Sequence, residues 1–86
     1  MPTLERQLKA LANKRRLAII KFLDNRREAS VGTIAGWIRL SFKSTSKHLS
    51  ILSAVDIVDK EQRSKTVFYH LVSPKSNLVK QILSLL

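Results

Sequence analysis

The sequence has 86 residues, with 16 lysines and arginines against 6 aspartates and glutamates, which gives a formal net charge of +10. This length predicts a single domain over residues 1–86, and the charge predicts an anionic partner, either nucleic acid or an anionic membrane surface. The absence of cysteine excludes disulfides and thiolate metal sites. No apolar run approaches the ~20 residues of a membrane span and no signal-peptide core is present, so we expect a soluble, cytoplasmic protein that does not bind membranes.

Two helices are expected at the start of the chain. The first covers residues 4–12 with Thr3 as its N-cap, and the second covers residues 14–24 with Asn13 as its N-cap. Apolar residues crowd most of the circumference of the second helix, which is typical of a central, buried helix. Residues 25–29 are polar and predict a turn.

A helix-turn-helix is expected next. Ser30 can cap a helix over residues 31–38, whose apolar positions fit the i, i+3, i+4, i+7 spacing fully. Arg39 and Leu40 turn the chain, and Ser41 can cap the following helix. A turn of a few residues between two short helices, the second polar and basic, is typical of the helix-turn-helix motif.

The second helix of this pair, within residues 40–52, has two different faces. Thr45, Leu49 and Leu52 recur at helical spacing and predict a buried stripe. The other face carries lysines and serines, and no acid occurs from residue 39 to residue 55. Cations and short hydroxyls suit phosphates and base edges, whereas a helix built for solubility usually mixes both charge signs. We therefore interpret this segment as a DNA recognition helix.

Beyond residue 55 the period of the pattern changes. Ile57 and Val58 predict the beginning of a strand, and residues 66–71 alternate as a second strand does. The polar stretch 59–65 between them predicts a hairpin with an extended tip. Ser73 and Pro74 predict the start of a final helix with two adjacent apolar stripes.

Four segments of the chain resemble the arsenical-resistance-repressor (ArsR/SmtB) winged-helix family. They are LKALANKRRLAII (8–20), SVGTIAGWI (30–38), STSKHLSIL (44–52) and TVFYHL (66–71), and together they cover nearly the whole chain. The most specific part is the run Ser46 to Leu49, followed at a similar distance by the aromatic strand. The resemblance implies a small homodimeric transcriptional repressor, in a family of which many members release DNA when a metal or another signal binds.

The sequence departs from the family pattern at several positions. Metal-sensing members place cysteines in the third helix or Asp and His ligands in the last helix, and this chain has none of these there, so neither metal site is expected. Glycines that are usual at the wing tip and before the recognition helix are Ser64 and Arg39 here. Phe42 stands where the family often has a polar residue, and it could touch a thymine methyl group or pack beneath the helix.

Further candidate DNA contacts flank the recognition helix. The cations at residues 14–16 oppose the dipole of their own helix, which a nearby phosphate would offset, although the resemblance implies a structural role for Arg16. Arg63 and Lys65 could reach the minor groove or flanking phosphates, or form an ordinary solvated turn. His48 lacks partners for catalysis or metal binding, and the resemblance implies packing or a backbone contact. The expected DNA-binding residues are Phe42, Lys43, Ser44, Ser46, Lys47, His48, Arg63, Lys65, Arg39, Lys14 and Arg15.

The terminal helices carry more apolar surface than one small chain can readily bury. Exposed stripes of this kind mark an interface, and a two-fold dimer through the first and last helices would cover them. The alternative is that both stripes pack within one chain. The expected dimer-interface residues are Leu4, Leu8, Leu11, Leu78, Val79, Ile82, Leu83 and Leu86.

The expected fold is a mainly α winged helix-turn-helix, with four helices, a β-hairpin and a final helix. The expected function is sequence-specific binding of double-stranded DNA as a transcriptional regulator, in the form of a homodimeric repressor at an inverted-repeat operator. Two other classes stay open: a non-specific architectural or RNA-binding winged helix, and a protein-interaction module on the same scaffold. The scattered acids offer no nucleophile–base pair, so we expect no enzyme and no cofactor. The sequence names no effector.

Overall fold

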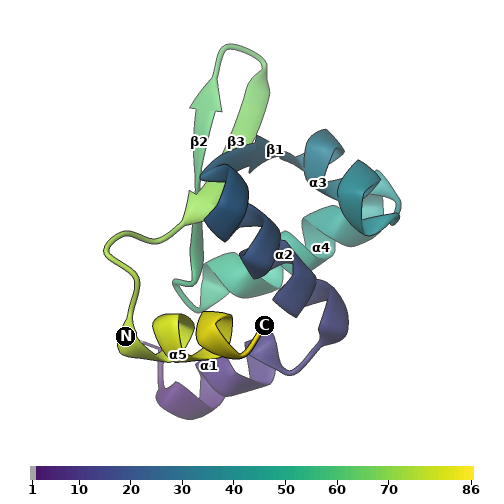
Figure 1. The fold of residues 1–86 in the computed structure, drawn as a ribbon. Coiled ribbons are helices and arrows are strands. Elements are labelled where there is room, and N and C mark those ends of the chain that lie inside the picture. The colour runs from purple at the N-terminus through teal and green to yellow at the C-terminus, as the bar shows by residue number, and fades with distance from the viewer. Residues whose placement is uncertain (1) are drawn as a thin grey trace.

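The computed structural model describes residues 2–86, which form five helices and three strands (Figure 1). The helices are α1 (Leu4–Leu11), α2 (Lys14–Arg26), α3 (Val31–Ile38), α4 (Phe42–Ala54) and α5 (Asn77–Leu85). The strands are β1 (Glu28–Ser30), β2 (Val58–Arg63) and β3 (Thr66–Leu71). None of the helices in the described part of the chain is long and apolar enough to cross a membrane.

Helix α2 is central and packs against α1, α3, α4 and the sheet. It begins after Asn13, whose side chain accepts hydrogen bonds from the backbone N–H groups of Arg15 and Arg16, as the sequence predicts. The helix continues two residues beyond the predicted end at residue 24. It stops where Arg27 takes a positive φ of 71°, with the Arg27 N–H bonded to the Leu23 carbonyl.

Helices α3 and α4 form the predicted helix-turn-helix. The Ser30 hydroxyl accepts a hydrogen bond from the Thr33 N–H, and the Ser41 hydroxyl accepts one from the Ser44 N–H. Between the helices Arg39 adopts a left-handed conformation, with φ 60° and ψ 48°. A residue other than glycine thus makes this turn, although the conformation favours glycine.

The sheet has a third strand that the sequence pattern did not predict. Strand β1 lies in the stretch expected to be a turn, and it pairs antiparallel with β3, with Ala29 opposite Tyr69. The strand order is β1-β3-β2. Three residues are too few to show an alternating pattern, and the pairing partner lies some forty positions away along the chain. The prediction of a turn over residues 25–29 is therefore wrong at both ends, because α2 continues to Arg26 and β1 begins at Glu28.

The wing is a tighter hairpin than predicted. Strand β2 runs through most of the polar stretch, so that Arg63 pairs with Thr66 and only Ser64 and Lys65 form the loop. Beyond Val58 the residues of β2 are exposed, which explains why no apolar alternation marks the strand. Ser64 has a positive φ of 58°. The prediction of an extended tip over residues 59–65 is wrong.

Helix α5 begins three residues later than the sequence suggested, at Asn77 instead of Pro74. Ser76 is its N-cap and accepts a hydrogen bond from the Val79 N–H. Two contacts place this end of the chain beside α2: Lys75 Nζ lies 2.6 Å from an Asp24 carboxylate oxygen, and Lys21 Nζ donates to the Leu86 carbonyl at 3.0 Å. The fold is a mainly α winged helix-turn-helix, as predicted, extended by one short strand.

Candidate nucleic-acid interface

The recognition helix α4 has the two faces that its sequence predicts. Thr45, Leu49 and Leu52 are fully buried in the core. On the opposite side Lys43, Ser44 and Lys47 are exposed, and Ser46 is half-buried. Because the apolar side packs against the rest of the domain, the polar side stands rigidly in solvent.

Free positive charge surrounds this exposed face. Four cations accompany it on neighbouring elements or on α4 itself, all exposed: Lys14 at the start of α2, Arg39 in the turn, Lys43 and Lys47. Within residues 2–86 none of these four forms an ion pair, and no acid occurs between positions 28 and 56. The α4 segment and its flanking turn therefore present positive charge without a neighbouring acid in the sequence.

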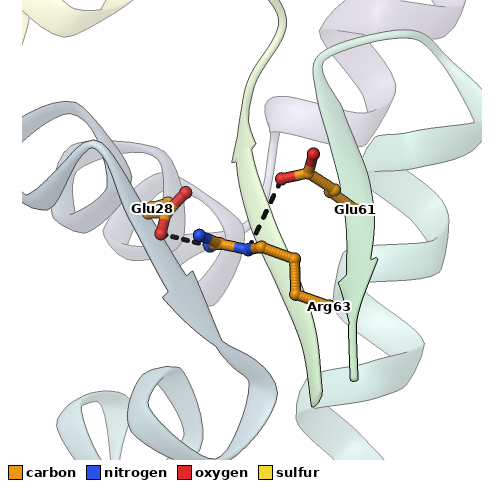
Figure 2. Close-up of polar contacts among 3 residues, drawn as sticks. All are labelled: Glu28, Glu61 and Arg63. Atoms are coloured by element: carbon orange, nitrogen blue, oxygen red, sulfur yellow. Dashed lines mark hydrogen bonds and ion pairs between the residues drawn. The ribbon is translucent and has the colours of Figure 1, made fainter. Parts of the chain in front are cut away.

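Arg63, a predicted DNA contact, is paired with acids, unlike the four cations above. Its guanidinium bonds the Glu28 carboxylate of β1, and its Nε lies 3.5 Å from a Glu61 carboxylate oxygen (Figure 2). The same group covers the Phe68 ring, with its central carbon 4.0 Å from the ring centroid. The hydrogen bond to Glu28 raises the pKa of Arg63. Both neighbouring acids engage this side chain, so Arg63 holds the wing to β1 and is neutralised there.

Arg15 also has a structural role that the sequence did not indicate. Its guanidinium donates to the Ile38 carbonyl at the end of α3, at 2.8 Å. The last carbonyls of a helix lack partners within the helix, so this contact satisfies one of them and ties α2 to α3. The three cations at residues 14–16 therefore have different surroundings. Lys14 is exposed to solvent, whereas Arg15 and Arg16 make contacts inside the protein.

His48 is half-buried on α4 and faces the protein through one ring nitrogen. Arg16 donates to His48 Nδ1 at 3.1 Å and, through Nε, to the Ala10 carbonyl at the end of α1. Arginine can only donate, so Nδ1 must be unprotonated. Burial lowers the pKa of His48, and the charges of Arg16, Arg15 and Lys47 lower it further. This geometry favours the packing role over a base contact.

Phe42 does not pack beneath the helix, because 64% of its surface is exposed. It lines a hollow of about 420 Å³ between α4, the start of α3 and the wing. Two wing lysines, Lys60 and Lys65, line the same hollow. Lys60 was missed in the sequence. The pairing of β2 with β3 across a two-residue loop places Lys60 directly opposite the buried Tyr69. The position of Lys60 could be inferred only once this register is known.

The apolar terminal helices are partly used by the core of the single chain. Leu11 and Val79 are buried within it, which removes them from the predicted dimer interface because they have almost no surface left to bury. Leu78, Ile82 and Leu83 are half-buried against the core. Leu4, Leu8, Leu85 and Leu86 are exposed, with Leu85 at 81%. Leu85 was not among the predicted interface residues.

No group of three metal-ligating side chains gathers anywhere in residues 2–86. The pKa of His48 is lowered by contacts inside the protein, and no other histidine or carboxylate lies beside it in the α2–α4 contact. The chemistry of this surface is therefore that of exposed ammonium and guanidinium groups, hydroxyls and one aromatic ring.

Comparison with known proteins gives close relatives, although no family model matches the chain. Transcriptional activator HlyU of Vibrio cholerae is 41% identical over 80 residues, which are 92% of this chain and 69% of HlyU. Nodulation protein NolR of Rhizobium meliloti is 37% identical over 79 residues, and the match covers 92% of this chain but only 62% of NolR.

The solved structures agree with this relationship. The structure of HlyU from Vibrio cholerae matches with a TM-score of 0.79 at 38% identity, over 93% of this chain and 83% of that one. A homodimeric winged helix-turn-helix DNA-binding domain from Mycobacterium bovis matches with a TM-score of 0.80 at 27% identity, over 95% of this chain and 72% of that one. The chain therefore belongs to the family of winged helix-turn-helix transcriptional regulators that includes HlyU.

Proposed function

We propose that the protein is a sequence-specific, double-stranded DNA-binding transcriptional regulator of the ArsR/SmtB type, without the metal ligands of its sensing members. The observation that carries this proposal is the exposed polar face of α4, with unpaired Lys43 and Lys47 above a fully buried apolar stripe. A recognition helix needs such an arrangement, because base edges can be read only by side chains on a fixed support. The acidic residues are scattered and support no enzymatic role. The protein would act in the cytoplasm.

The contacts divide into two groups in this proposal. Side chains at the start of α4 would read base edges, and the cations around it would bind phosphates and set the register. The first group is Phe42, Lys43, Ser44, Ser46 and Lys47, and the second is Lys14, Arg39, Lys60 and Lys65.

The protein would act as a homodimer. The exposed leucines of α1 and α5 supply the apolar surface, and the similar domain from Mycobacterium bovis is described as homodimeric. Two-fold symmetry would present two α4 helices to successive major grooves, about 34 Å apart, on an inverted repeat. A dimer bound across a promoter would exclude polymerase and repress, whereas one bound upstream could have the activating role named for HlyU.

Selection of binding sites from a random duplex library tests the function. We expect enrichment of an inverted repeat with half-sites one helical turn apart, because the dimer is symmetric. Affinity for the selected site should exceed that for random duplex by about 10³-fold or more at physiological salt. Tight binding without enrichment would contradict the proposal and indicate an architectural or RNA-binding protein. Weak binding even at low salt would indicate a protein-interaction module.

Two lysine variants sharpen the same measurement. Lys47→Ala should weaken binding to the selected site more than binding to random duplex, because a base contact carries sequence preference and a phosphate contact does not. Lys80→Ala, an exposed lysine on α5, is the matched control and should change neither affinity. Equal losses on both duplexes for Lys47→Ala would assign Lys47 to the phosphate group of contacts.

A further inference from the structure

Phe42 is an exposed aromatic residue in the middle of a polar surface. The other exposed apolar side chains have neighbours of their own kind: the leucines cluster on α1 and α5, Trp37 stacks on Phe22 at 4.8 Å, and Ile51 lines a groove with α1. Phe42 instead precedes Lys43 and Ser44, as the first residue of α4. A large apolar side chain left in water at this point indicates a surface that is covered when the protein binds.

The surroundings of Phe42 indicate what covers it. The hollow beside the ring is bounded by Ser46 of α4, by the start of α3 at Val31, and by the wing. Lys60 and Lys65 enter it from the wing, and neither forms an ion pair within the described residues. The helix side of the hollow thus carries the Phe42 ring, and both of its cations come from the wing, which fits a nucleotide with its base toward α4 and its phosphate toward the wing.

We propose that Phe42 reads the C5-methyl group of a pyrimidine, thymine or 5-methylcytosine, while Lys60 and Lys65 hold the phosphate backbone of the same strand. This inference rests on the proposed function. The Phe42 ring has no hydrogen-bond donor or acceptor, so it can select only apolar groups on the floor of the major groove. Among the four ordinary bases thymine alone presents one there, and methylation of cytosine places a methyl group at the same carbon.

The position of Phe42 in α4 favours a base over a sugar. The N-terminal residues of a recognition helix contact base edges in helix-turn-helix proteins, and Phe42 is the first of them here. Ser41 caps the helix directly before it, which fixes the direction of the backbone at this residue. The ring is thus held at the tip of the helix, where a one-carbon difference on a base can be sensed.

Replacement of thymine by deoxyuridine tests the proposal, because it removes the methyl group and leaves base pairing intact. Each thymine of the selected site is replaced in turn, and the dissociation constant is measured for the native protein and for Phe42→Ala. We expect one position in each half-site where the native protein loses about fourfold in affinity per methyl removed. Phe42→Ala should bind the thymine and deoxyuridine duplexes equally. At that position, a 5-methylcytosine·guanine pair should bind the native protein about fourfold more tightly than a cytosine·guanine pair.

Two control variants separate methyl reading from general loss of packing. Phe42→Leu keeps an apolar side chain and should keep the sensitivity to deoxyuridine, as should Ile51→Ala, which shortens an exposed side chain elsewhere on α4. Sensitivity that is equal in the native protein and in Phe42→Ala would overturn the proposal, and so would a site without any methyl-sensitive position. Failure to select any site would overturn the proposed function itself, and this inference with it.

Discussion

Arg63 and Lys65 lie two residues apart at the end of the wing, yet their surroundings are opposite. The guanidinium of Arg63 bonds Glu28, contacts Glu61 and covers Phe68, whereas the ammonium of Lys65 enters the hollow beside Phe42 without an acidic partner in the described chain. Charge alone would count both residues as phosphate ligands. Their contacts leave that role to Lys65.

Salt dependence distinguishes the two residues. Log affinity falls as log salt concentration rises, and each phosphate contact on duplex DNA makes this slope steeper by about 0.9. Lys65→Ala should therefore make the slope shallower by about one for each protomer that makes the contact. Arg63→Ala should leave the slope unchanged. The measurement is the affinity for the selected site between about 50 and 200 mM salt.

The thermal midpoint provides the control for this pair. The Arg63 ion pairs are partly exposed, and exposed ion pairs contribute little to stability, so Arg63→Ala should remain folded. Equal decreases in slope for the two variants would show that Arg63 leaves Glu28 when DNA binds.

Local signals predicted the caps and the recognition face, and non-local contacts limited the rest of the site. Ser30 and Ser41 were identifiable because a cap bonds an N–H only three residues ahead. Arg63 could not be assigned, because Glu28 lies 35 residues away in a strand that shows no pattern of its own. Lys60 was missed for the same reason, since its position depends on the register of the hairpin.

At the scale of elements, Arg16 joins three helices through two contacts. From α2 it donates to the Ala10 carbonyl at the end of α1 and to His48 Nδ1 on α4. The contact with His48 exists only while Nδ1 is unprotonated, because a protonated ring nitrogen cannot accept a hydrogen bond. One of the polar contacts between α2 and α4 therefore depends on the protonation state of His48.

The pH dependence of stability follows from the lowered pKa of His48. Burial lowers this pKa most, followed by the positive charges of Arg16, Arg15 and Lys47. When the pKa is lower in the folded protein than in the unfolded chain, the unfolded chain binds the proton first as the pH falls. The contribution of neutral His48 to the free energy of unfolding is therefore present above about pH 6.5. It is lost as the pH falls through the pKa that His48 has in the folded protein. Urea denaturation between pH 7.5 and pH 5.5 should show a falling free energy of unfolding.

His48→Gln isolates this contribution, because a glutamine side chain can still accept a hydrogen bond from Arg16 but does not titrate. The comparison is made in a His70→Gln background, where His48 is the only histidine. The His48→Gln protein should have a flatter pH profile. Profiles of the same slope with and without His48 would show that the Arg16 contact does not govern its protonation.

Elements with a complete apolar period were predicted almost to the residue, and those without one were not. Helices α3 and α4 begin at their predicted caps because each buries one regular stripe. Strand β2 shows no alternation because its residues beyond Val58 are exposed, and β1 is too short to show any. The start of α5 was misplaced because Ser73 and Ser76 are both acceptable caps, and only packing selects Ser76.

Across the whole molecule, the exposed leucines and the cations around the reading face lie on different elements. The exposed leucines belong to α1 and to the end of α5, whereas the cations around the reading face are lysines of α4 and the wing and Arg39 of the turn before α4. A chain of this size buries only about 60–65% of its unfolded surface, so covering the leucines would add stability that a single copy lacks. The proposed dimer and DNA interfaces would therefore use separate surfaces, so both could form together.

Substitution of the exposed leucines tests the dimer. Leu8→Glu combined with Leu85→Glu should give a monomer in sedimentation experiments at micromolar concentration, because a charge buried in an apolar interface is strongly unfavourable. The monomer should bind the inverted repeat more weakly than the dimer and with a lower salt slope. Ile51→Glu places the same charge on an exposed apolar residue of α4 and should leave the dimer intact. A dimer that survives the double substitution would place the interface elsewhere.

The chain places its glycines where the backbone does not need them. Gly32 and Gly36 lie within α3, where a side-chain carbon would meet nothing within 4 Å, while within residues 2–86 the positive-φ positions are occupied by Arg27, Arg39, Asp56 and Ser64. Each such turn costs a residue with a side chain about 1 kcal/mol, and each helical glycine costs a similar amount relative to alanine. Selection has thus left this fold below the stability that its own backbone allows. Variants of this chain with alanine at the two glycines and glycine at these positive-φ positions should be more heat-resistant, without any change to the core.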